Sequence, residues 1–208
     1  MTDREMLTDI GESLLIEAFS SEHRSKARLA GEAVAGILTA RQWTDRFAVK
    51  VEGERVLIPA RLHFASEALP LIQSDDAWRL ARALQTRSND GFERQRAARD
   101  LLADLQPWSA PFIVALIGEY IVQILDDIAA ALTPENARML GTFIAQNQSY
   151  WGTTKRRVTS YWNAYYRSDL ATSPRPEWAR NFRPLFQQNE YVGFSLIKQL
   201  EAAAFGRE

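Results

Sequence analysis

The sequence predicts a mainly α protein of stacked antiparallel helices with one β-hairpin at about 46–64. Most segments place apolar residues three or four positions apart, the spacing of one helix face, whereas only the hairpin region alternates with a period of two. The segment 109–132 is apolar on nearly every side and is interrupted by Glu119. Because a helix without a polar face must be surrounded by other elements, we expect 109–132 to be the central, buried helix.

Two amphipathic helices are expected before the hairpin, over residues 3–19 and 24–42. Each repeats apolar residues at helical spacing, which predicts one face packed against the rest of the protein. The inward residues are Leu7, Ile10, Leu14 and Ala18 in the first helix, and Ala27, Ala30, Val34 and Ile37 in the second.

The hairpin prediction rests on alternation in two short runs separated by Glu52-Gly53-Glu54-Arg55. Phe47 to Val51 alternates, and so does the run that begins at Val56. Pro59 has no N–H to give to a ladder, so the second strand lies at an edge or ends there. An exposed edge can accept a strand from a partner or from a second copy of the chain. We therefore expect self-association as a homodimer.

Everything after residue 74 is expected to be helical, apart from turns. Ser74 begins a helix as its N-cap, and Asp75 and Asp76 suit the positive end of the helix dipole. Ala77, Trp78, Ala81 and Leu84 are its predicted inner face. Later boundaries are expected at the turn 88–91, at Pro107, at Ser109, at Thr133-Pro134 and in the Pro-rich loop 172–176, with a last helix from about Asn189.

One local pattern resembles a known repeat family. Asp90 in a turn is followed by Arg94, Ala97 and Leu101, and this is similar to the second helix of a HEAT repeat. The resemblance covers about thirty residues when the preceding helix is included, and no second copy is evident. It implies stacked helix pairs and a protein-binding role on a concave face.

Composition places the chain among ordinary globular proteins. It has 208 residues, 46% of them hydrophobic and 25% charged, with a net charge of −1. We expect a single helical domain over 1–208, whose near-neutral net charge creates no overall electrostatic attraction to nucleic acid.

The absence of cysteine excludes disulfides and thiolate metal sites. The N-terminus is unlike a signal peptide, and charges interrupt 109–132, so a cytoplasmic protein without membrane contact is expected.

Residues with catalytic potential are few. Glu119 lies among apolar residues, where a carboxyl group can become an acid or base, although a structural role is favoured. No nucleotide-binding loop or nucleophile elbow is present. His23 and His63 lack metal-ligand spacing, so neither a metal nor a cofactor is expected.

A run of cations raises a second possibility. If Thr153 or Thr154 begins a helix, then Lys155, Arg156 and Arg157 occupy its first turn, where they oppose the helix dipole. Three explanations remain open at this point. Acids such as Asp126, Asp127 or Glu135 pair with them, or 134–168 is one bent helix, or the residues from Thr154 to Arg157 bind a phosphate or a nucleic-acid backbone.

Three further residues are candidates for contact with a partner. Arg87 lies in a predicted turn, while Tyr166 and Arg167 fall outside the apolar stripe of their helix. The favoured function is a non-catalytic protein-interaction or adaptor module. The alternatives are a nucleic-acid or phosphate-binding protein that uses 153–157, and an enzyme that uses Glu119.

Overall fold

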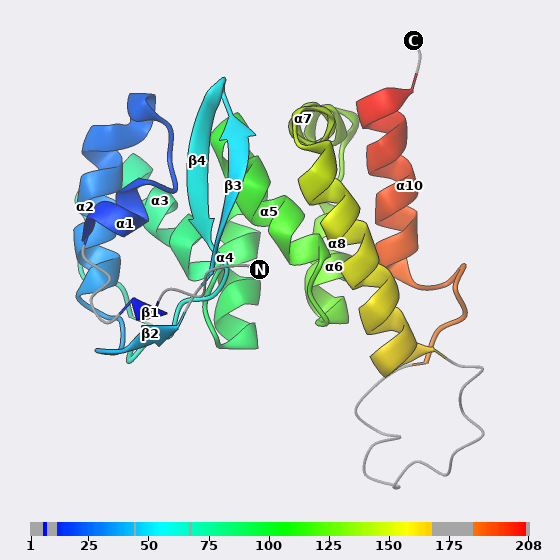
Figure 1. Ribbon diagram of the computed structural model, residues 1–208, viewed down its shortest axis with the longest axis horizontal. Helices are drawn as coiled ribbons and strands as arrows, with labels where there is room; N and C mark the ends of the chain where they lie inside the picture. Colours follow the sequence, from blue (N-terminus) through cyan, green and yellow to red (C-terminus); the bar gives the residue numbers. More distant parts are fainter. Residues whose placement is uncertain (1–5, 8–11, 44, 67, 168–184, 207–208) are drawn as a thin grey trace, which may run out of the picture. The chain divides into compact units, whose positions relative to one another are not determined.

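A computed structural model of the chain describes residues 6–7, 12–43, 45–66, 68–167 and 185–206. It confirms a mainly α protein with one well-formed β-hairpin (Figure 1). The contacts divide the chain into two compact units, residues 1–113 and residues 114–208. The predicted Pro-rich loop at 172–176 lies outside the described residues.

The first unit is built mainly on helices α1 to α4, and each helix packs against the next one along the chain. They span Glu12–Ile16, Arg24–Ala35, Asp75–Gln85 and Gly91–Leu102, and a short 3-10 turn, η1, precedes α2 at Ser21–His23. In this unit α2 packs against both α1 and α3, and α3 packs against α4. The small residues Ala27, Ala30 and Val34 form the buried side of α2, as expected.

The two predicted N-terminal helices are too long. Met6–Leu7 forms strand β1, which pairs with β2 at Gln42–Trp43, so the prediction of a helix over 3–19 is wrong. The second helix ends at Ala35 because the following chain bonds to the segment after the hairpin. Thr39 N donates to His63 O at 2.9 Å, and Leu38 forms a bridge with Phe64.

The predicted hairpin is confirmed and consists of β3, Arg46–Val51, and β4, Glu54–Pro59. Glu52 and Gly53 both have positive φ, 51° and 88°, as a two-residue turn of type I′ requires. Val49, Val51, Val56 and Ile58 are buried on one face of the hairpin. After Pro59 the chain leaves the ladder, and Leu62 forms a bridge with Ser88.

Helix α3 begins at the predicted cap Ser74, and α4 begins at Asp90 within the predicted turn 88–91. The Ser74 hydroxyl accepts a bond from Ala77 N at 3.3 Å, and the Asp90 carboxylate accepts one from Glu93 N at 2.8 Å. The predicted inner face of α3 is right for Ala77, Ala81 and Leu84 but wrong for Trp78, which is exposed. Leu80, two residues further along the same helix, is buried instead.

The prediction of one continuous central helix over 109–132 is wrong, because the segment forms two helices. A 3-10 turn, η2, spans Pro107–Ser109, helix α5 spans Ala110–Ile117 and helix α6 spans Val122–Ala130. Gly118 follows α5 and has the weakest helix propensity after proline, and Ile121 is extended. The burial prediction is right for the first half, since every residue from 110 to 119 is buried.

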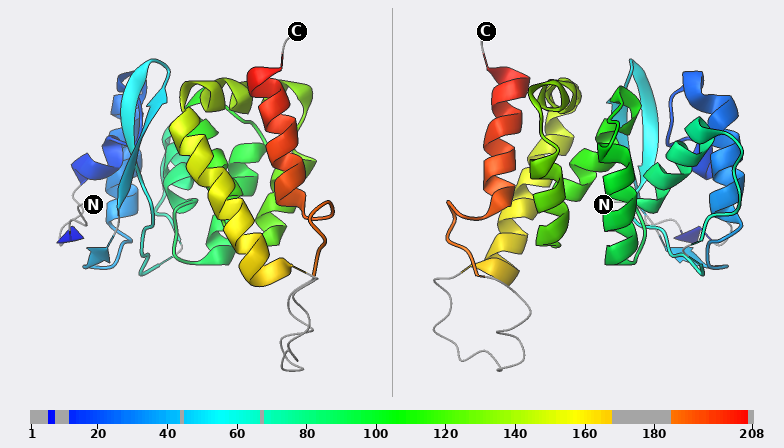
Figure 2. Two further views of the ribbon diagram at one scale, coloured as in Figure 1. Left: turned by 45° about the vertical axis from the view of Figure 1, so that its right-hand side comes forward. Right: turned by 180° about the vertical axis from the view of Figure 1, so that it is seen from behind.

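The second unit also contains α7, Pro134–Gln146, α8, Gln148–Tyr161, and α10, Val192–Phe205. Helix α10 packs against α6 and α7 (Figure 2). Thr133 caps α7 and Pro134 is its first residue, as predicted. Helix α8 continues into a π-helical turn, η3, at Trp162–Tyr166. Among the helices of the described ranges, none is both long and apolar enough to cross a membrane.

Candidate functional site

The predicted basic helix start at 153–157 is wrong. Helix α8 begins at Gln148, directly after a break at Asn147, where φ is −129° and ψ is 46°. Lys155, Arg156 and Arg157 therefore lie in the middle of the helix, where backbone N–H groups are bonded within the helix. The same break also contradicts the alternative of one bent helix over 134–168.

Internal pairing accounts for Lys155, although not with the acids expected. Its Nζ lies 2.6 Å from Glu201 Oε1 on α10, and Trp151 Nε1 donates to the same oxygen at 3.2 Å. The bond from Lys155, supplemented by the one from Trp151, holds the pKa of Glu201 below its ordinary value. Arg156 donates to the hydroxyl of Thr153 at 2.8 Å. These contacts favour a structural role for the run over anion binding.

The prediction that Tyr166 is exposed is wrong. Its side chain is buried, its hydroxyl donates to Tyr120 O, and its ring stacks on Tyr191 with centroids 5.4 Å apart. The π-helical turn is the cause: Arg167 N donates to Trp162 O, five residues back, at 2.9 Å. The extra residue in that turn changes the face on which Tyr166 lies.

The side chain of Arg167 contacts residues of the π-helical turn η3. Its guanidinium lies 5.4 Å from the centroid of the Trp162 ring and donates to Asn163 Oδ1 at 3.1 Å. A cation above an indole face is attracted by the electrons of the ring. The predicted role in partner binding is therefore not favoured by the position of Arg167.

Arg87 is also placed differently from the prediction. It is 1% exposed and cannot present its charge to a partner carboxylate. Its Nε donates to Pro59 O at 3.2 Å and its Nη2 donates to Ala60 O at 2.7 Å. Arg87 thus connects the end of the hairpin to the α3–α4 turn.

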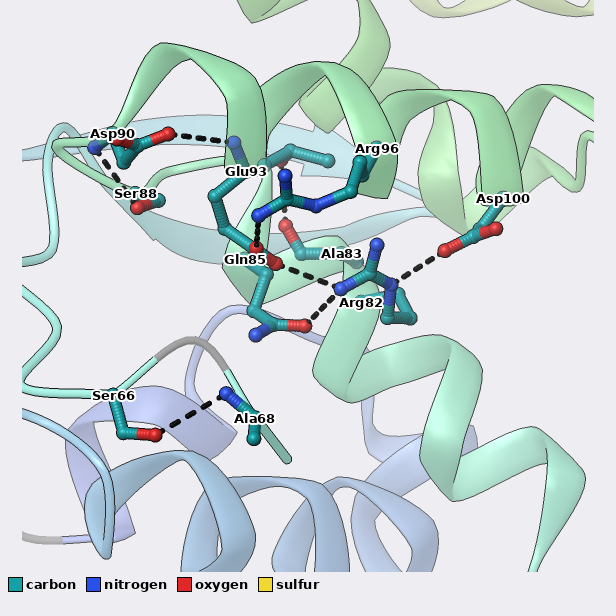
Figure 3. Close-up of polar contacts among 11 residues, drawn as sticks. Ser66, Ala68, Arg82, Ala83, Gln85, Ser88, Asp90, Glu93, Arg96 and Asp100 are labelled. Carbon is teal, nitrogen blue, oxygen red and sulfur yellow. Dashed lines mark hydrogen bonds and ion pairs between the residues drawn. The ribbon is translucent and has the colours of Figure 1, made fainter. Parts of the chain in front are cut away.

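A network of charged side chains surrounds that turn (Figure 3). Glu93 is buried and accepts bonds from Arg82 and Arg96, each at 2.8 Å. Arg82 donates further to Gln85 and, at 2.6 Å, to Asp100. Buried charges are tolerated where they are paired and hydrogen-bonded, as here.

The residues that resemble a HEAT repeat begin at the same turn and continue along α4. Asp90 caps α4, and Arg94 donates to Ser88 O at 2.7 Å and to Asn89 O at 3.2 Å. Ala97 and Leu101 are buried. The contacts of Asp90 and Arg94 fasten one helix pair internally, so the pattern has a local structural explanation.

Glu119 is buried at the turn that follows α5, and its N–H donates to Leu116 O at 3.0 Å. An enzyme that used this carboxylate would need a cavity reaching it. Glu119 lines neither the groove beside α2 nor the polar cavity beside η1.

The larger cavity is an open groove of about 670 Å³ between α2 and the segment that leads into α3. Leu29, Glu32 and Ala33 line one side, and residues 71–74 line the other. Leu71 is 93% exposed and Leu29 is 47% exposed. The groove is therefore lined by exposed leucines and by one exposed carboxylate, that of Glu32.

Sequence reasoning missed this groove. The run Leu69-Pro70-Leu71-Ile72 is the available signal, because an apolar run that contains proline and lies outside a helix pattern is not explained by core packing. The other wall comes from α2, about forty positions earlier in the chain, and no sequence pattern relates the two segments.

The second cavity, of about 290 Å³, is polar and lies between η1, α2, α3 and η2. His23, Trp108 and Gln106 contribute to its wall. Its charged groups are paired, Lys26 with Asp76 and Arg79 with Asp104.

Comparisons with protein families, with curated proteins and with solved structures find no match for this chain.

Proposed function

We propose that this protein is a non-catalytic protein-interaction module whose groove between α2 and residues 71–74 binds a peptide segment of a partner. The observation that carries the proposal is the exposure of Leu71 beside Leu29. Exposing apolar surface to water costs a free energy of roughly 25 cal/mol per Å². Exposed apolar side chains that share a concave surface are therefore typical of binding sites.

The charges around the groove indicate what kind of partner fits. Glu32 lines the groove and is exposed, and Asp75 at the start of α3 is exposed nearby in the chain. Among the described residues that line the groove there is neither lysine nor arginine. Complementary charges favour specific encounters and disfavour wrong partners. The partner segment is therefore expected to carry apolar side chains followed or preceded by a lysine or arginine.

Selection from a displayed library of random peptides tests the proposal. We expect peptides that combine apolar and basic residues to be enriched on the full chain. A synthetic version should bind the Leu71→Asp variant at least tenfold more weakly, because a carboxylate would replace an exposed apolar side chain of the groove. Phe92→Asp is the matched control, since Phe92 is 74% exposed on α4 and does not line the groove.

Leu71 is too exposed to contribute much to folding, so Leu71→Asp should keep the wild-type melting temperature. The proposal fails if no peptide is enriched, or if the enriched peptides bind Leu71→Asp as well as they bind the wild type. A preference for acidic peptides would contradict the proposed charge of the partner.

A further inference from the structure

Three potential metal ligands meet where η1 touches the hairpin turn. Glu22 and His23 belong to η1, and Glu52 is the first residue of the turn between β3 and β4. One ligand atom from each of the three side chains lies within 4.8 Å of the others. The chain brings these residues together across about thirty positions.

The imidazole of His23 supplies an independent observation. Its Nε2 is buried and has no hydrogen-bond partner among the described residues, and Glu52 Oε2 lies 3.5 Å away, at ion-pair distance. Buried polar atoms in proteins nearly always have a partner. Two ligands that each lie ~2.1 Å from a tetrahedral ion are themselves about 3.4 Å apart. The 3.5 Å between His23 Nε2 and Glu52 Oε2 suits a shared ion, and Glu22 offers a third ligand atom within 4.8 Å of both.

Neighbouring groups hold two of these side chains in place. The Ser20 hydroxyl donates to Glu52 Oε2 at 2.8 Å, and the His23 ring packs edge-on against Trp108 with centroids 5.9 Å apart. Ser21 N donates to Glu54 at 2.8 Å and so fastens the hairpin turn to η1. Such outer contacts orient ligands and raise the affinity of metal sites.

The local charge balance favours a cation. Glu22 and Glu52 bring two carboxylates, while Lys26 and Arg79 in the adjoining cavity are each paired with an aspartate. Glu22 is exposed, so an ion can reach the cluster from solvent.

We propose that Glu22, His23 and Glu52 form a binding site for a divalent transition metal of the zinc class. One imidazole nitrogen with two carboxylate oxygens suits zinc, whereas calcium and magnesium prefer oxygen ligands alone. Three protein ligands leave a fourth position for water. The ion connects η1 to the hairpin turn and thereby stabilises the first unit.

The test is a titration of the full chain, prepared without an affinity tag, with zinc chloride. The chain has two histidines and no cysteine, so each imidazole can be followed separately by NMR after 15N labelling. We expect the His23 signals to shift and to saturate at one equivalent of zinc, while the His63 signals stay unchanged. Magnesium at the same concentration should shift neither.

Calorimetry on variants gives a second readout. Glu52→Gln and His23→Gln should each weaken zinc binding at least tenfold, and His63→Gln, the matched control, should not. Glu52 lies in an exposed turn, so Glu52→Gln keeps the test valid even if His23→Gln unfolds. The proposal is overturned if zinc does not bind, if His63 responds in place of His23, or if Glu52→Gln binds with wild-type affinity. A simple His23–Glu52 ion pair would then explain the cluster.

Discussion

Glu93 is the residue on which the charge network of the α3–α4 turn depends. It is buried, and it is the shared acceptor for Arg82, which is mostly buried, and for Arg96, which is half exposed. Replacing one partner of a buried pair leaves the other charge without compensation, which costs more than the intact pair contributes.

We expect Glu93→Gln to lower the free energy of unfolding by about 2–4 kcal/mol, with Asp100 still neutralising part of the Arg82 charge. Arg96→Gln, the control, removes the exposed partner of the same carboxylate and should cost less than about 1 kcal/mol. Urea denaturation measures both values. Equal losses in the two variants would mean that burial of the carboxylate does not determine its contribution.

Helix α10 is held at two places by very different contacts. The ion pair between Lys155 and Glu201 joins it to α8, and a close backbone approach at Gly141 joins it to α7. The first contact depends on pH and the second does not.

The α8–α10 pair should respond to acid. The pKa of Glu201 is lowered in the folded protein, chiefly by the bond from Lys155 and also by that from Trp151, and the ordinary value is 4.5. A carboxyl group with a lowered pKa stabilises the fold above its ordinary pKa, and this stabilisation is lost as the pH falls through the folded pKa. Since the Glu201 side chain is partly exposed, its contribution is small.

Wild type and Glu201→Gln should therefore differ in stability at pH 7 and should converge as the pH falls through the folded pKa of Glu201, which lies below 4.5. Thermal unfolding across this pH range, with Glu190→Gln as the exposed control, measures the difference. A difference that persists at low pH would show that the ion pair is not its source.

Gly141 lets α7 approach α10. An added Cβ at this position would lie 2.8 Å from the carbonyl carbon of Ala203, which is main-chain and cannot rotate away. Gly141→Ala should thus cost about 1–3 kcal/mol despite the better helix propensity of alanine. Gly152→Ala is the control within α8, where an added Cβ meets only the end of Arg156 at 3.6 Å. It should be neutral or stabilising by up to about 1 kcal/mol.

For the molecule as a whole, the hairpin is the feature that bears on self-association. Asp45 O accepts a bond from Ala60 N, so alternate residues of β3 bond to β4 and the backbone of Ala48 faces away from β4. Within the described residues, β3 has β4 as its only ladder partner. A second copy of the chain can add a strand at such an edge.

If the homodimer forms through β3, size exclusion with light scattering should give twice the chain mass for the wild type and a monomer for Ala48→Pro. Proline removes the outward N–H at that position without removing a bond to β4. Ala48→Thr keeps the N–H and should remain dimeric. A wild-type monomer at high concentration, or a dimeric Ala48→Pro, would contradict the prediction.

The caps at Ser74, Asp90 and Thr133 and the hairpin turn at Gly53 were predictable because their signals lie within a few residues. The break after α5 was not predictable, because Gly118 is the only weak helix former near it and a single charged residue, Glu119, is common within helices. The exposure of Tyr166 was predicted wrongly because a π-helical turn has no reliable local pattern.

The sequence by itself determined the helical class, the hairpin and most helix starts, since these depend on local hydrogen bonds and on the spacing of apolar residues. Only the tertiary structure decided that Lys155 pairs with Glu201, that Leu71 and Leu29 line one groove, and that His23 faces Glu52. The partners in these contacts lie tens of residues apart in the chain. Their proximity depends on how the helices pack, and packing is shared among many weak contacts that no local pattern records.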